Sequence, residues 1–210
     1  MVEGYKPVPI QYRKSPANIL SYNYEDVASG LGVSTFYLFN TTNSTATTYH
    51  LTDQVIYSAD IAQKITASTT SDTDYDLTTF NHPRTTEGTG IIQLSVGAQT
   101  TAGVTSFYVV LTLRKVSGGV ETDLVSVTSP TLTTAANPTS SALNFCMEMT
   151  IPKTLFKIGD TLRLNVAGTT NAGGVGYIGI DPKSRSKGIG HTVTMTITDS
   201  NIQVPFKLEV

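Results

Sequence analysis

Apolar and polar residues alternate with a period of two along much of this chain. The segment TSFYVVLTLRKV, residues 105–116, places its apolar side chains on one face and its polar side chains on the other. The same alternation occurs in TLRLNV (161–166), HTVTMTIT (191–198) and NIQVPFKLEV (201–210). A period of two indicates strands with one buried and one solvated face, which is typical of antiparallel sheets.

Strands are expected over most of the remaining chain as well, whereas helices are not. The best helical candidate is a single turn in IPKTLFKIGD, beginning at Pro152 and ending at Gly159. Strands that recur at short intervals between turn signals predict an all-β fold, an antiparallel β-sandwich of jelly-roll type spanning residues 19–210. The further predicted strands are 35–40, 46–50, 54–58, 90–97 and 119–128.

Two segments lack this periodicity. Residues 1–18 contain three prolines and predict an extended N-terminal arm that crosses a neighbouring subunit or the surface of its own domain. Residues 129–141, SPTLTTAANPTSS, predict a polar loop between strands, where variable contacts are commonly found.

The composition supports an all-β protein and argues against nucleic acid as a partner. Threonine makes up about one residue in six, and charged residues make up 14%, against about 25% in an average domain. The net charge of −2 gives no field that would attract nucleic acid. No apolar run approaches the roughly 20 residues of a membrane helix. The N-terminus has no apolar core of a secretory signal, so we expect none.

The single cysteine excludes an internal disulfide bond and any multi-cysteine metal site. In ALNFCMEMTI the alternation places Cys146 on the polar face, together with Asn144, Glu148 and Thr150. We therefore predict an inert cysteine.

The stretch GVGYIG, residues 174–179, matches the dinucleotide-binding pattern G-x-G-x-x-G. That pattern binds a pyrophosphate only where it follows a strand and opens a helix. Here Ile180, Asp181 and Pro182 follow, and no helix is expected. The stretch predicts a glycine turn that runs into a strand, and no cofactor.

The best metal candidate is the alternating run Asp72, Asp74 and Asp76. Calcium prefers several oxygen ligands, which alternating aspartates in a loop can supply. The glycine and glutamate of an EF-hand loop are replaced by Leu77 and Pro83, and alternation in a strand would turn all three carboxylates to solvent. We predict no metal, with these three aspartates as weak candidates.

Catalytic residues are not apparent in the sequence. A hydrolytic triad needs a serine or cysteine, a histidine and an acid in one place. His50, His82 and His191 lie at strand ends or in a turn, and no G-x-S-x-G motif accompanies them. We predict that the chain is not an enzyme, and a hydrolase remains a third hypothesis.

Several residues are candidates for contacts between subunits. Tyr5 and Tyr12 lie in the predicted arm, and Lys183, Arg185 and Lys187 lie in the Gly- and Ser-rich loop 181–190. These three cations are too few for a nucleic-acid surface but suit an acidic neighbour. The glycosylation sequons at Asn40 and Asn43 are interpreted as part of a polar hairpin loop.

The segments SYNYEDVASGLGVSTFYLF, DYDLTTFNHPRTTEGTG, IPKTLFKIGDTLRLNV and YIGIDPKSRSKG…VPFKLEV resemble small Thr- and Gly-rich β-sandwich (jelly-roll) virion proteins of tailed bacteriophages and related environmental viruses. The resemblance implies a non-enzymatic capsid, head-decoration or other virion component. Such a protein assembles in the host cytoplasm as a homo-oligomer through contacts with its own copies and other virion proteins, without direct nucleic-acid or membrane contact. The alternative is a glycan- or receptor-binding module of a viral tail or fibre.

Overall fold

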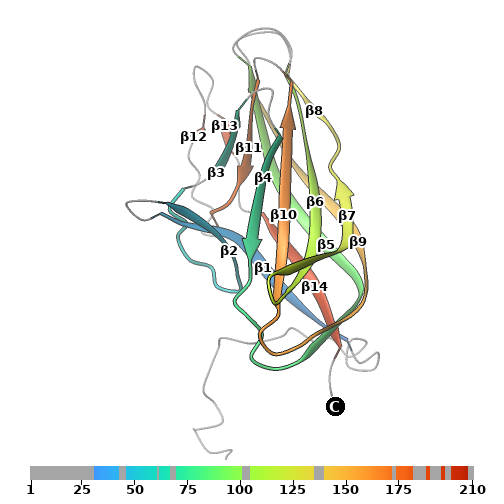
Figure 1. Ribbon diagram of the computed structural model, residues 1–210. Coiled ribbons are helices and arrows are strands. Elements are labelled where there is room, and N and C mark those ends of the chain that lie inside the picture. Colours follow the sequence, from blue (N-terminus) through green and yellow to red (C-terminus); the bar gives the residue numbers. More distant parts are fainter. Residues whose placement is uncertain are drawn as a thin grey trace, which may run out of the picture.

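The structure, a computed structural model, consists of strands and irregular segments (Figure 1). It describes residues 31–42, 46–60, 62–66, 70–100, 105–134, 140–171, 174–181, 188–189, 195–196 and 200–207. These residues contain no helix, and thus none long and apolar enough to span a membrane. The all-β prediction is confirmed. The strands are β1 Leu31–Thr42, β2 Thr47–Thr52, β3 Ala62–Thr66, β4 Thr70–Asp76, β5 Arg84–Thr100, β6 Ser106–Ser117, β7 Val120–Thr128, β8 Leu132–Thr133, β9 Ser140–Phe156, β10 Thr161–Thr170, β11 Gly174–Gly179, β12 Gly188–Ile189, β13 Met195–Thr196 and β14 Asn201–Lys207.

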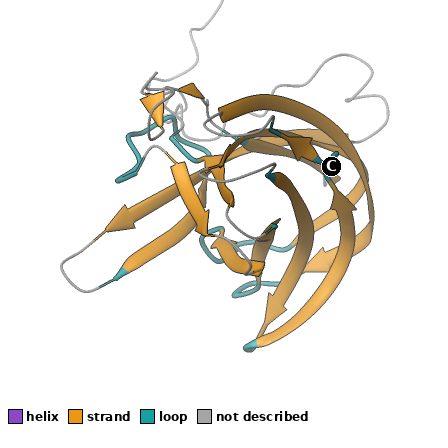
Figure 2. Cartoon of the chain, turned by 90° about the horizontal axis from the view of Figure 1, so that it is seen from above, coloured by secondary structure: helices purple, strands orange, loops and turns teal. Residues whose placement is uncertain are grey.

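Twelve of the described strands form one continuous sheet, and β12 and β13 form a separate pair. The sheet order is β3-β11-β5-β14-β1-β2-β4-β10-β6-β7, with β8 beside β6 and β9 beside β5. Seen from above, the long strands follow a curved arc (Figure 2). Neighbouring strands are antiparallel except β2 and β4, which are parallel where His50 pairs with Asp76. The sheet is therefore mixed, which corrects the prediction of a purely antiparallel one.

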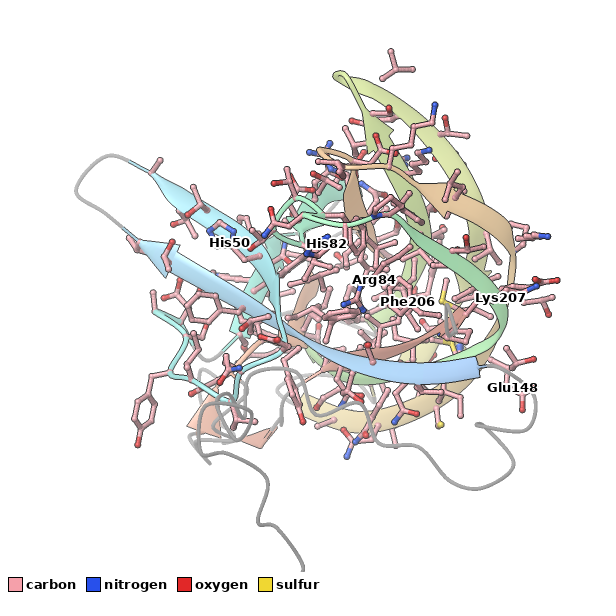
Figure 3. All side chains as sticks on the ribbon, turned by 90° about the horizontal axis from the view of Figure 1, so that it is seen from below. His50, His82, Arg84, Glu148, Phe206 and Lys207 are labelled. Carbon is pink, nitrogen blue, oxygen red and sulfur yellow. The ribbon has the colours of Figure 1, made fainter. Side chains whose placement is uncertain are left out.

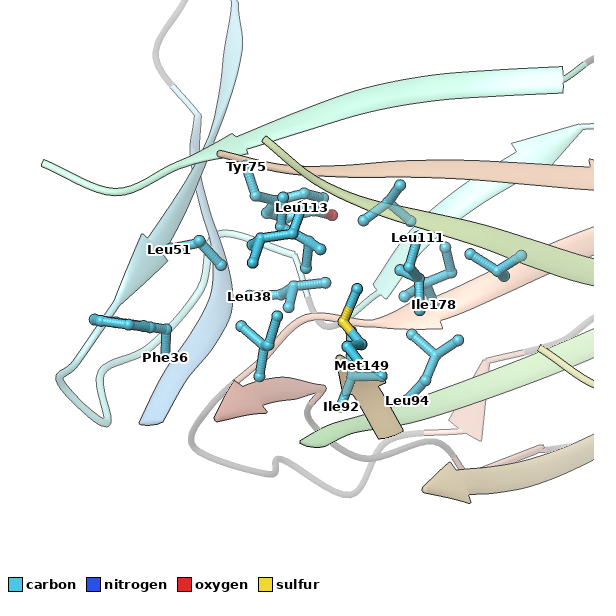
Figure 4. Close-up of a cluster of buried hydrophobic side chains, with 14 of the residues drawn as sticks. Phe36, Leu38, Leu51, Tyr75, Ile92, Leu94, Leu111, Leu113, Met149 and Ile178 are labelled. Atoms are coloured by element: carbon cyan, nitrogen blue, oxygen red, sulfur yellow. The ribbon is translucent and has the colours of Figure 1, made fainter. Parts of the chain in front are cut away.

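The apolar faces of most strands meet in one large core (Figure 4), and Tyr177 forms a small second cluster with Ala62 and Val175. Leu111 and Leu113 of β6 are fully buried, as is Leu164 of β10, whereas Arg114 and Arg163 on the opposite face remain partly accessible. Ile92 of β5 also lies in this core. Each such side chain contributes about 1.5–3 kcal/mol on burial. The alternation in the sequence therefore identified the buried face of these strands correctly.

One predicted strand, residues 54–58, is wrong. This segment follows β2 as an irregular loop in which Val55, Ile56 and Tyr57 are exposed. The loop returns to β1 instead of pairing along its length: the Ala59 amide donates to the Asn40 carbonyl at 2.9 Å. The apolar composition of the segment favoured a strand, but no neighbouring strand covers it in the described structure.

The predicted helical turn at residues 152–159 is also wrong. Residues 151–156 continue strand β9, with Ile151 and Phe156 buried. Pro152 is tolerated because it lies where the register of β9 against β5 shifts, directly after the Ile151–Gly88 pair, in which Gly88 has a φ of 124°. Gly159 ends the segment in a turn, with a φ of 86° that favours glycine.

The GVGYIG stretch is strand β11 throughout, held between β3 and β5. A methyl group at Gly176 would lie 2.4 Å from a ring carbon of the buried Phe107. At Gly174 it would lie 2.2 Å from the side chain of Thr105. These glycines therefore allow β11 to pack closely against Phe107 of β6 and against Thr105, which precedes β6.

Some predictions lie outside the described residues. They are the arm at 1–18 with Tyr5 and Tyr12, the cations Lys183, Arg185 and Lys187, and also Asn43 and His191. The proposed contacts of these residues stay predictions. The loop 129–141 is described only at its two ends, where β8 and the start of β9 lie.

Candidate ligand-binding site

A cavity of about 770 Å³ lies between the β1–β2–β14 part of the sheet and the segment 77–82, which connects β4 to β5. This volume falls within the roughly 300–1,000 Å³ typical of small-molecule sites. Arg84, the first residue of β5, also lines it. The connection crosses from β4 to β5, which have different neighbours in the sheet. The cavity thus forms where a non-strand segment passes one end of the core.

Three buried phenylalanine rings form the apolar wall of the cavity. Phe36 comes from β1, Phe80 from the crossing segment and Phe206 from β14. The ring of Phe206 makes edge contacts with Phe36 at 6.4 Å and with Phe80 at 6.1 Å between centroids. Phe80 also contacts Phe156 at 5.1 Å. The rings therefore hold one another in place and form a continuous apolar wall.

The crossing segment is fixed by backbone hydrogen bonds to the turn before β10. The Phe80 amide donates to the Asp160 carbonyl, and the Gly159 amide donates to the Phe80 carbonyl, each at 2.9 Å. The Asp160 carboxylate accepts a hydrogen bond from the Lys157 amide at 2.7 Å. It also forms an ion pair with the Lys115 ammonium at 2.9 Å. The Lys157 amide, the Ser117 hydroxyl and Lys115 together lower the pKa of Asp160 to about 2. The position of Phe80 therefore depends on a charged turn.

Arg84 is the cation of this site. It is half-buried, and its guanidinium carbon lies 5.7 Å from the centre of the Phe206 ring (Figure 3). No carboxylate of the described chain lies within ion-pair distance of it. The other two described arginines, Arg114 and Arg163, each contact several carboxylates. The described lysines without an ion pair are all exposed: Lys64, Lys153 and Lys157.

The rim of the cavity is polar and mostly neutral. Exposed Asn81 and His82 lie on one side, and the end of β2 with Asp53 and Gln54 lies on another. Gln54 donates a hydrogen bond to the Asp53 carboxylate at 3.3 Å. Figure 3 shows Arg84 beside Phe206, with His82 nearby. An apolar wall, one guanidinium and several neutral polar groups can bind an organic molecule with a polar end.

The aspartates of β4 lie elsewhere, on the outer face of the sheet. Their carboxylates share one face, as predicted, but they are engaged by side chains of β10. Arg163 forms a two-point ion pair with Asp76 at 2.6 and 2.7 Å and contacts Asp74 at 2.9 Å. Asn165 donates to both Asp72 and Asp74. The hydrogen bond with Asp76 raises the pKa of Arg163. These carboxylates are therefore satisfied by protein groups, and no described cluster of three or more ligands suits a metal.

The other predicted chemical residues are dispersed. The His50 ring contacts Thr48 Oγ1 at 3.1 Å, and among the described residues His82 has no hydrogen-bond partner. Neither described histidine is thus joined to a serine or cysteine and an acid. Cys146 is exposed on β9, as predicted from the alternation.

The site residues were not singled out from the sequence. Phe36 and Phe206 were recognised only as strand residues, and Arg84 was not considered. The signal that could have found the site is FNHPR, residues 80–84, a non-periodic stretch with an aromatic and a basic residue between two strands. Functional residues are often found on such connections.

No family model matches the chain, and no curated protein matches its sequence. Among solved structures, a CocE/NonD family hydrolase from Staphylococcus aureus is similar over 84% of this chain and 37% of its own, with 14% identity and a TM-score of 0.49. An α-amino acid ester hydrolase is similar over 65% of this chain and 25% of its own, with 13% identity and a TM-score of 0.43. A structure of infectious bursal disease virus, Gt strain, is similar over 93% of this chain and 53% of its own, with 10% identity and a TM-score of 0.21.

These comparisons contradict the prediction of a non-enzymatic virus-particle component. The two hydrolases reach TM-scores of 0.49 and 0.43, against 0.21 for the viral structure. The virion prediction is therefore wrong, as are its alternative of a viral tail or fibre module and the prediction that the chain is not an enzyme. The chain spans 37% and 25% of the length of the two hydrolases, and with TM-scores below 0.5 their activity does not transfer to it.

Proposed function

We propose that this chain is a binding domain that takes a small organic molecule into the cavity between β1, β2, β14 and residues 77–82. The observation that carries the proposal is the wall of mutually contacting Phe36, Phe80 and Phe206 rings beside the Arg84 guanidinium, which has no carboxylate within ion-pair distance among the described residues. Binding sites of this kind combine apolar surface with a few polar groups that fix the orientation of the ligand.

The fixed position of the wall supports a ligand-binding site rather than an incidental depression of the surface. The rings come from three distant parts of the sequence, and the crossing segment is held by the Phe80–Asp160 and Gly159–Phe80 hydrogen bonds. A ligand that enters such a site does not need to order it first. Less conformational entropy is lost on binding, which favours affinity.

The test is ligand-detected NMR with a set of small aromatic fragments, on the wild-type chain and two tryptophan variants. Thr79 is an exposed residue that lines the cavity, so Thr79→Trp is expected to fill it. Thr131 is also exposed and outside the strands but does not line the cavity, so Thr131→Trp is the matched control. Fragments should bind the wild type and Thr131→Trp but not Thr79→Trp. Binding that persists unchanged in Thr79→Trp, or no binding at all, contradicts the proposal.

A finer description of the fold belongs with this proposal. The curled sheet is a sandwich of jelly-roll type, in which the β6–β10 part and the β5–β9 part cover the core from two sides. Its support is that Leu113 and Leu164 share one buried cluster with Ile92 and Met149. An experimentally determined structure that places these two pairs on facing layers tests the description.

A further inference from the structure

We infer that the ligand of this cavity is a carboxylate with an apolar body, and that Arg84 is the residue that binds its anionic end. This inference rests on the proposed function and names the ligand class. Among the described lysines and arginines, only Arg84 is half-buried and also has no carboxylate within ion-pair distance.

The charge on Arg84 requires an acceptor. A guanidinium stays protonated in proteins and cannot lose its charge when it is partly buried. An unpaired buried charge is unfavourable unless a counter-charge or water compensates it. Elsewhere the described chain provides that counter-charge, because Arg163 reaches Asp74, Asp76 and Glu121. Arg84 instead lines the cavity, so a carboxylate that pairs with it would come from a ligand in that cavity.

The geometry favours a carboxylate over a phosphate. One guanidinium matches a single negative charge, and its fork of N–H groups fits two carboxylate oxygens. A phosphate dianion would call for further cations, and the described lining provides no lysine and no second arginine. Asp53 at the rim would repel additional negative charge. The neutral amides of Asn81 and Gln203 complete a site for one anionic group.

The rest of the ligand is set by the phenylalanine wall. The Phe206 ring contacts both the Arg84 guanidinium and the ring of Phe80, so the anion site and the apolar wall are adjacent. A molecule with its carboxylate on Arg84 would lay its remaining atoms along Phe206 and Phe80. Flat aromatic or branched aliphatic groups suit such a surface because aromatic rings pack well edge to face.

The experiment compares three probes of the same shape in calorimetry: 2-naphthoate, the neutral 2-naphthamide and 2-naphthyl phosphate. A charged two-point hydrogen bond should make naphthoate bind about ten- to a hundredfold more tightly than naphthamide. Arg84→Gln should abolish this preference for naphthoate over naphthamide, and Arg84→Lys should retain only part of it, because an ammonium lacks the fork. Lys64→Gln, which removes an exposed cation of β3 outside the lining, is the control and should change nothing.

Each other outcome has a defined meaning. Equal affinities for naphthoate and naphthamide, both lost in Thr79→Trp, overturn the carboxylate assignment and leave the binding proposal intact. A preference for naphthyl phosphate overturns it in favour of phosphate. No binding of any probe overturns the binding proposal itself. Circular dichroism of Arg84→Gln shows whether the variant folds, and if it does not, the naphthoate-to-naphthamide ratio of the wild type decides.

Discussion

Gly176→Ala tests whether the glycines of β11 are required for packing. The added methyl group would lie 2.4, 2.5 and 2.8 Å from three ring carbons of Phe107, whereas ordinary carbon contacts lie at about 3.5–4.0 Å. The ring must therefore withdraw by roughly 1 Å, but Phe107 is only 1% exposed and has no free space. Overpacking of this kind costs about 1–3 kcal/mol, and we expect the upper part of that range.

The assay is equilibrium urea unfolding, with thermal unfolding as a second measurement. A loss of about 2–3 kcal/mol corresponds to a fall in Tm of about 4–12 °C for a chain of this length. Phe107→Leu alone should destabilise the domain, because it leaves a cavity. When it is combined with Gly176→Ala, the new methyl group fills part of that cavity. The double variant should therefore be more stable than the sum of the single effects by at least about 1 kcal/mol.

A result within about 0.5 kcal/mol of the wild type for Gly176→Ala would refute this reasoning, because it would place that change among ordinary surface substitutions. Additive effects of Gly176→Ala and Phe107→Leu would show that the two residues are not coupled. The close approach of β11 to β6 would then not be the reason for glycine at this position.

Three further predictions concern the charged groups and one turn. Arg163→Gln should lower the free energy of unfolding by about 1–3 kcal/mol in urea titrations, with a smaller loss at high salt, because it breaks the two-point pair with Asp76 and leaves several carboxylates together. Asp160→Asn should be less stable than the wild type at neutral pH. Since the folded-state pKa of Asp160 is lowered to about 2, that difference should persist above its ordinary pKa and vanish as the pH falls from about 4 towards 2. Gly159→Ala should cost about 1 kcal/mol, because its φ of 86° disfavours other residues, and should weaken fragment binding near Phe80 in the NMR assay.

Much of the sheet could be predicted from the sequence because its strands have one buried face. In β6 and β10 every apolar position of the predicted inner face is buried, although Thr112 and Asn165 on the other face are buried as well. Leu111 and Leu164 were therefore placed in the core and Arg163 outside it. Where burial follows a period of two, local sequence is sufficient. The same reasoning placed Cys146 on the exposed face of β9.

The errors arose where the local pattern does not determine the partner. Val55 and Ile56 have strand-forming side chains, but a strand also needs a neighbour, and no strand of the described structure pairs along this loop. The loop is attached to β1 through Asn40 instead, by the Ala59 amide and the Ser58 hydroxyl. Pro152 resembled a helix start, but it is tolerated at the bulge of β9 against β5. Whether a neighbouring strand is available depends on the whole topology, which no window of ten residues contains.

The cavity was beyond prediction for a related reason. Its wall joins Phe36 near one end of the chain with Phe206 near the other, and β1 meets β14 only after the sheet has formed. Arg84 shows no feature in the sequence that separates it from other basic residues. Its distinction is the absence of a carboxylate beside it in the described structure, whereas Arg114 and Arg163 have theirs, and that is a property of the fold.

The crossing segment links the stability of the domain to its proposed binding. Residues 77–82 must cover the end of the core, which Phe80 does by packing against Phe156 and Phe206. The hydrogen bonds that hold Phe80 run to the Asp160 turn, whose carboxylate is held by Lys115 and the Lys157 amide. Loss of the Asp160 charge should therefore loosen the turn and the cavity wall together, so that affinity and stability decline over the same acidic range. Affinity that stays constant while stability falls there would mean that Phe36 and Phe206 alone maintain the wall.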